Sequence, residues 1–201
     1  MTWIKTIAYE DAVGPLLKLY DQIKGPDDNV DNIMLAHSLR PHTMQGHMSL
    51  YKYVLHHPRN TVAKWFMEAV GIFTSILNEC HYCIEHHYVG MTRLLNDDAR
   101  SEAIRVALES NDWAAVFDAR EVAALEYVRK LTLSPAEISD SDIRSLRDVG
   151  WEDGEILEIN QVAAYFNYAN RTVLGLGINT NNDILGLSPS DSTDSTNWRH
   201  Q

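Results

Sequence analysis

Apolar side chains recur along the chain with the period of an α-helix, and no stretch alternates as a β-strand does. Proline and glycine mark several helix ends. Pro15 falls in the first turn of one helix and Gly25 stops it, whereas Pro41 opens a helix that Pro58 ends. The pattern predicts helices over 14–24, 33–39, 41–57, 62–78, 79–95, 99–108, 118–131, 140–149 and 152–175. The predicted fold class is therefore all-α.

The apolar pattern fades near residue 179, and the segment Ser188–Thr196 is almost entirely polar. A chain of 201 residues is long enough to bury about 70% of its unfolded surface in one core. We therefore expect residues 1–180 to form a single helical domain. Residues 181–201 should form a polar tail, mobile unless Trp198 docks on the domain.

The charge of the chain is acidic: 17 Lys and Arg against 28 Asp and Glu give a net charge of −11. Nucleic acid and anionic membrane surfaces would repel such a chain, so neither is an expected partner. The longest apolar stretch, 69–77, is too short to span a membrane. The segment Met1–Thr6 lacks the features of a signal peptide, and we expect a cytoplasmic protein.

Two cysteines, Cys80 and Cys83, begin a predicted helix, and His87 follows one turn later. On a helical wheel the three lie at about 0°, −60° and −20°, that is, on one face. His86 lies about 120° from Cys80, a poorer position for proton exchange. Free backbone N–H groups at a helix start stabilise a thiolate, and His87 can exchange a proton with Cys83. This arrangement is suited to reversible dithiol/disulfide chemistry.

Together with Glu68, the same residues resemble the sequence signature of a known protein family. The pattern Glu68-x11-Cys80-x-Tyr82-Cys83-x3-His87 is similar to the signature of the alkylhydroperoxidase D-like proteins, in the carboxymuconolactone decarboxylase superfamily. The context resembles the peroxidase-related branch at Val30–Met34 and at Tyr165–Arg171, and the likeness covers most of residues 1–180. Tyr82 is a departure, because histidine is often found at that position in the family.

The resemblance implies an all-helical homo-oligomer that reduces alkyl hydroperoxides or hydrogen peroxide without a metal or cofactor. Cys83 would attack the peroxide, Cys80 would then close a disulfide, and Glu68 with His87 would form a proton relay. A thiol donor, in the family a dihydrolipoyl-bearing protein, would reduce the disulfide. The residues alone leave the order of the cysteines open. Cys80 lies nearer the helix start, whereas His87 is the neighbour of Cys83; we follow the histidine.

Other interpretations of the cysteine pair remain open. A dithiol module could act on other proteins, and a decarboxylase-like enzyme could share the fold, although such members generally lack the pair. A zinc-stabilised binding protein could use Cys80, Cys83 and His87, but no second pair completes a four-ligand set.

Two further predictions concern polar residues outside the cysteine motif. His81 and His86 point away from the cysteine face and are expected at solvent or at an interface. The helix at 152–175 carries amides that need partners, and we expect them to form a polar seam between subunits: Asn160, Gln161, Asn167 and Asn170.

Overall fold

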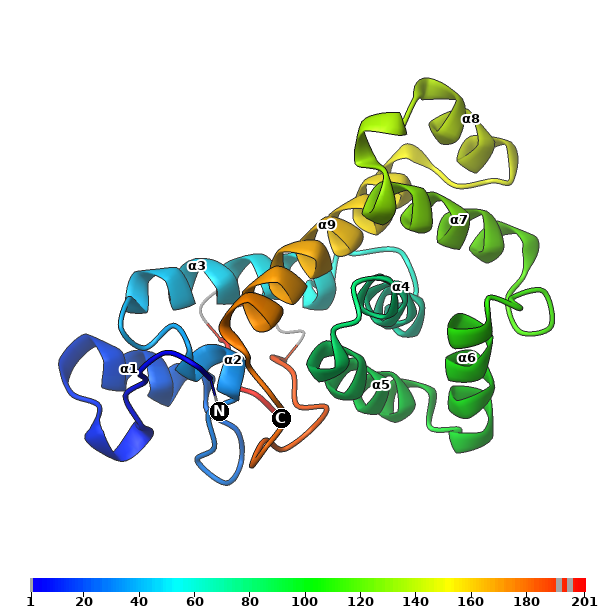
Figure 1. Cartoon of the computed structure of the whole chain (residues 1–201). Helices are drawn as coiled ribbons and strands as arrows, with labels where there is room; N and C mark the ends of the chain where they lie inside the picture. The colour runs from blue at the N-terminus through cyan, green and yellow to red at the C-terminus, as the bar shows by residue number, and fades with distance from the viewer. Residues whose placement is uncertain (1, 191–192, 195–196) are drawn as a thin grey trace.

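A computed structural model describes residues 2–190, 193–194 and 197–201. Within these residues the chain is helical and forms no strand, which confirms the all-α prediction (Figure 1). The helices are α1 (Gly14–Ile23), α2 (Asn32–Leu35), α3 (Pro41–Tyr51), α4 (Lys64–Leu77), α5 (His81–Leu95), α6 (Asp98–Ser110), α7 (Ala119–Leu133), α8 (Asp140–Asp148) and α9 (Asp153–Leu176). Among these helices none is both long and apolar enough to cross a membrane.

Helix α4 lies at the centre of the molecule, where α5, α7 and α9 pack against it. Its residues from Phe66 to Ser75 are all buried. Gly71 allows α9 to approach closely, because a Cβ at this position would come within 2.2 Å of the Phe166 ring. The central helix is therefore enclosed by apolar contacts, and a polar side chain on it is held in a fixed place.

The connection between α4 and α5 is a tight reversal over Asn78–Cys80. The Cys80 N–H donates to the Ser75 carbonyl at 2.8 Å and the Glu79 N–H donates to Ile76 at 3.0 Å, the two bonds of a Schellman motif. Glu79 adopts the left-handed conformation with φ of 57°, which side chains other than glycine and asparagine disfavour. The turn makes α4 and α5 an antiparallel pair.

The helix at 41–57 differs from its prediction in its last turn. It continues past Tyr51 as a π-helical turn over Lys52–His56, so that Lys52 becomes fully buried. Its Nζ donates hydrogen bonds to the backbone carbonyls of Asp194 and Asn197, at 2.7 and 2.5 Å. The buried ammonium thus ties α3 to the C-terminal segment.

The described residues of the C-terminal segment pack on the helical body, close to α2 (Figure 1). Trp198 and His200 are both 5% exposed, and the His200 Nδ1 lies 2.6 Å from the Ile23 carbonyl. The sequence predicts a mobile tail unless Trp198 docks on the domain. In the structure Trp198 does dock. Residues 191–192 and 195–196 of the polar stretch lie outside the described residues.

Candidate active site

The two cysteines lie at the start of α5 and are free thiols in contact. Cys80 is the N-cap residue, Cys83 is in the first turn, and their Sγ atoms are 3.2 Å apart. A disulfide bond is about 2.05 Å long, so the sulfurs need approach by only about 1.2 Å to form one. Both thiols are buried, Cys80 fully and Cys83 at 3% exposure.

The contact makes the two thiols unequal acids. The hydrogen bond between the sulfurs lowers the pKa of Cys80 against the effect of burial, and the Cys83 N–H and the Asn170 amide act in the same direction. The pKa of Cys83 is raised well above its usual value by the same hydrogen bond and by burial, which disfavours its thiolate. Cys80 is therefore the more acidic thiol of the pair.

Glu68 and His87 form a second pair beside the thiols. Glu68 projects from α4 and is 3% exposed, and its Oε2 lies 2.6 Å from Nδ1 of His87 on α5. The carboxylate accepts from Nδ1–H, which leaves Nε2 as the ring atom that can exchange a proton. Phe166 and Tyr51 contact the imidazole with their rings in edge-to-face geometry and fix its plane. The antiparallel pairing of α4 and α5 thus brings the predicted glutamate and histidine together.

A small cavity of about 40 Å³ opens beside Cys83 and His87. It has room for a few water-sized molecules, which suits the two oxygens of a peroxide group. Cys83 lines the cavity and Cys80 does not. The lining residues are Asp31, Ile33, Met34, His47, Tyr51, Tyr82, Cys83, His86, His87, Tyr165, Ala169 and His200.

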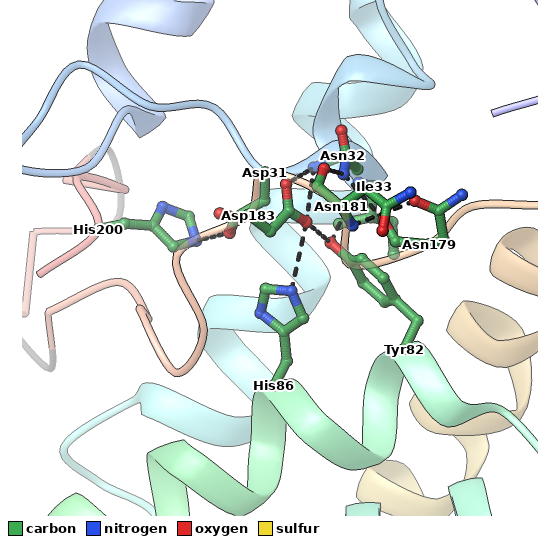
Figure 2. A network of polar contacts seen from close by, with 9 residues as sticks. All are labelled: Asp31, Asn32, Ile33, Tyr82, His86, Asn179, Asn181, Asp183 and His200. Carbon is green, nitrogen blue, oxygen red and sulfur yellow. Dashed lines mark hydrogen bonds and ion pairs between the residues drawn. The ribbon is translucent and has the colours of Figure 1, made fainter. Parts of the chain in front are cut away.

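A polar network lies at one end of this cavity and centres on Asp183, in the chain after α9 (Figure 2). Its carboxylate accepts hydrogen bonds from the Tyr82 hydroxyl at 2.8 Å and from the Asn32 N–H at 3.1 Å. His86 Nε2 lies 3.3 Å from the same carboxylate. Three segments far apart in the sequence, around residues 32, 82 and 183, are thereby held together.

The structure corrects two predictions about polar residues near the thiols. His86 is buried against Asp183, so its assignment to solvent or an interface is wrong; His81 is exposed as predicted. Asn170 is fully buried and donates to Ser75 Oγ at 3.0 Å, and Asn160 donates to the Tyr127 hydroxyl. Asn167 likewise donates to Thr132 Oγ1 and to the Ala163 carbonyl. These three amides therefore have partners within the chain, where a seam between subunits was expected, whereas Gln161 is exposed and its place in a seam stays a prediction.

Several residues of the site were not among the sequence candidates. Asp31 and Tyr165 stand in the two segments that carried the resemblance, but neither was given a role. His200 and Asp183 carry no local signal, since their contacts join residues more than 90 positions apart. In the described part of the chain, no group of three or more His, Cys, Asp or Glu side chains is arranged to hold a metal ion.

Comparison with known proteins gives matches among solved structures. No protein-family model matches the chain, and no curated protein matches it either. An uncharacterized peroxidase-related protein from Silicibacter sp. is 25% identical, with a TM-score of 0.64, over 73% of this chain and 74% of that chain. An alkylhydroperoxidase AhpD core, an uncharacterized peroxidase-related protein from Ralstonia eutropha, is 19% identical, with a TM-score of 0.73, over 89% and 91%. A debrominase in complex with 2,3,4-tribromopyrrole is 17% identical, with a TM-score of 0.69, over 89% and 91%.

Proposed function

We propose that the chain is a thiol-dependent peroxidase, a proposal supported by the similarity of its structure to alkylhydroperoxidase D-like, peroxidase-related proteins. It reduces hydrogen peroxide or alkyl hydroperoxides, and a dithiol/disulfide cycle of Cys80 and Cys83 supplies the two electrons. One observation carries the proposal: the sulfurs are 3.2 Å apart, and Cys83 faces the small cavity together with His87.

The reaction begins with the loss of one proton from the thiol pair. The proton that remains resides on Cys80, which leaves a Cys83 thiolate at the cavity wall. The thiolate attacks the terminal oxygen of the peroxide: the S–O bond forms, the O–O bond breaks, and the other oxygen departs as alkoxide or hydroxide. Cys83 becomes a sulfenic acid, and the departing oxygen takes up a proton.

The second step closes the disulfide. The Cys80 sulfur attacks the sulfenic sulfur of Cys83, the S–S bond forms, and the hydroxyl leaves as water with the Cys80 proton. His87 exchanges protons with the cavity through Nε2, while Glu68 holds its tautomer and orientation. The sum is two thiols and one peroxide giving one disulfide, one alcohol or water, and one water.

Each turnover requires a thiol donor that reduces the disulfide. In agreement with the resemblance, we place a dihydrolipoyl-bearing protein in this role, in the cytoplasm, where cysteines are kept reduced. We also propose that the chain forms a homo-oligomer. Large apolar side chains are exposed on α9, as such an assembly would use: Leu157, Tyr168 and Leu174.

The test counts free thiols in the reduced protein before and after one equivalent of hydrogen peroxide. Wild type should lose both thiols per peroxide within seconds to minutes. Cys83→Ser should keep its remaining thiol, whereas Cys80→Ser should accumulate a sulfenic acid on Cys83 that dimedone traps. The reverse pattern would exchange the roles of the two cysteines. Thiols that persist in wild type would contradict the proposed peroxidase activity.

A parallel reaction with 2,3,4-tribromopyrrole addresses the chemistry of the debrominase neighbour. A ring with three bromine atoms is too large for a cavity of about 40 Å³, so we expect no thiol loss. Thiol loss with this compound and not with peroxide would favour a dithiol reductase of other substrates.

A further inference from the structure

Asp31 is a buried carboxyl group on the wall of the cavity that Cys83 also lines. It precedes α2, and it is 9% exposed. Among the described residues its Oδ1 has no hydrogen-bond partner, and its Oδ2 lies 3.8 Å from His200 Nε2, beyond hydrogen-bond distance. The neighbouring Asp183 is different, because the side chains and backbone of α2 and α5 satisfy its carboxylate.

A carboxylate without hydrogen bonds is costly to bury, so the neutral acid is the favoured form of Asp31. Burial raises its pKa to about 7, with a smaller increase from Asp183, while His86 and His87 lower it. His200, Tyr51 and Tyr82 also face Asp31. Burial lowers the pKa of His200 to about 4 and raises those of both tyrosines well above their usual value. Asp31 thus carries a transferable proton into a cavity that a thiol lines.

We propose that Asp31 is the general acid of this site and protonates the oxygen that leaves when the Cys83 thiolate attacks a peroxide. The inference rests on the proposed peroxidase and supplies the proton donor that its first step lacks. Asp31 lies outside the sequence pattern of Glu68, Cys80, Cys83 and His87.

Atoms, protons and electrons balance in this step. The thiolate of Cys83 forms the S–O bond with the terminal oxygen, and the O–O electron pair passes to the leaving oxygen. That oxygen takes the proton of Asp31 and departs as alcohol or water. The sulfur is oxidised by two electrons, the peroxide is reduced by two, and Asp31 is left as a carboxylate that regains its proton from solvent.

The other cavity groups are poorer or competing donors. Burial raises the pKa of Tyr51 and Tyr165 well above the usual value, which makes both weak acids. Burial keeps His47 neutral, with a pKa of about 3. His87 is the competing donor, and its contribution can be separated by experiment.

The experiment compares two oxidants that differ in the leaving group. Hydrogen peroxide expels hydroxide, which needs a proton, whereas peracetic acid expels acetate, which does not. Stopped-flow rate constants for oxidation of Cys83 are measured with both oxidants on wild type and Asp31→Asn near neutral pH. We expect a loss of about 10²-fold with hydrogen peroxide and less than about threefold with peracetic acid. Because both rate constants are measured on the same protein, their ratio does not depend on the fraction of that protein that is folded.

Asp183→Asn is the matched control, because it makes the same chemical change at a buried carboxylate that does not line the cavity. Its ratio of the two rate constants should equal that of wild type, even if both rates fall. If Asp31→Asn slows both oxidants equally, the ratio of the two rate constants is unchanged, and this result would overturn the role of Asp31 as general acid. If His87→Ala changes the ratio and Asp31→Asn does not, the donor is His87. A wild type unreactive toward hydrogen peroxide would overturn the peroxidase itself, a result distinct from these.

Discussion

At the scale of single residues, the more acidic thiol and the thiol that lines the cavity are different cysteines. Cys80 is the more acidic thiol but does not line the cavity, and Cys83 lines the cavity but is the weaker acid. Once the pair has lost one proton, a transfer over 3.2 Å places the thiolate on Cys83. Reactivity is therefore coupled to the presence of both sulfurs and to the base beside Cys83.

We predict that His87→Ala moves thiol reactivity to higher pH by about one unit, because Nε2 no longer takes up a proton from the thiol pair. Glu68→Gln should produce a smaller shift in the same direction, since the amide still contacts Nδ1 without stabilising the imidazolium. The measurement is the rate of alkylation by iodoacetamide against pH. His81→Ala, on the exposed side of α5, is the control. Superimposable profiles for His87→Ala and wild type would remove the histidine from the mechanism.

At the scale of elements, the reversal between α4 and α5 fixes the distance between the groups proposed to be catalytic. Its Schellman bonds place Cys80 at the N-cap of α5, and the antiparallel pairing then sets His87 opposite Glu68. The left-handed conformation of Glu79 is the energetic cost of this arrangement.

We predict that Glu79→Gly stabilises the fold by about 0.5–1 kcal/mol, because glycine adopts positive φ without steric strain. The urea midpoint of unfolding measures this change. Asn96→Gly is the control: Asn96 also has positive φ, at the end of α5, but asparagine tolerates this conformation and should gain less. A lower midpoint for Glu79→Gly would show that its side chain contributes more than its backbone costs.

The helices were predictable because their signals are local. Apolar spacing and caps gave α6 to α9 within about two residues, and the capping box of Asp118 and Glu121 marks the start of α7. The contact of Glu68 with His87 also follows from spacing, once the two helices pair. The π-helical turn at Lys52–His56 does not follow, because its buried lysine depends on a tail 140 residues later. Asp31 was not predicted as a site residue for the same reason, because its burial comes from contacts distant in sequence.

At the scale of the whole molecule, burial strongly lowers the pKa of three histidines among the described residues. Burial lowers the pKa of His47 to about 3 and those of His56 and His200 to about 4. The unfolded chain binds protons at these sites below about pH 6.5 and the folded chain does not. Their contribution to stability is present above about pH 6.5 and is lost as the pH falls toward 4. The raised pKa of Asp31 opposes this trend, but it is one group against three.

We predict that the urea midpoint falls as the pH is lowered from 7 to 5, at a cost of about 2 kcal/mol for each of these histidines. His56→Gln should flatten the dependence, because one of the three protons is no longer taken up on unfolding. His42→Gln, at an exposed histidine, should leave the slope unchanged. A midpoint independent of pH in this range would contradict the buried neutral histidines.

The docked C-terminal segment has a consequence for biosynthesis. The thiol pair belongs to α5, whereas His200 closes the cavity from a segment more than a hundred residues later. On the ribosome, α4 and α5 emerge and pair well before that segment is made. During this interval the sulfurs are already adjacent and one wall of their cavity is absent. We therefore expect a nascent chain at this stage to react with bulkier oxidants than the finished chain does.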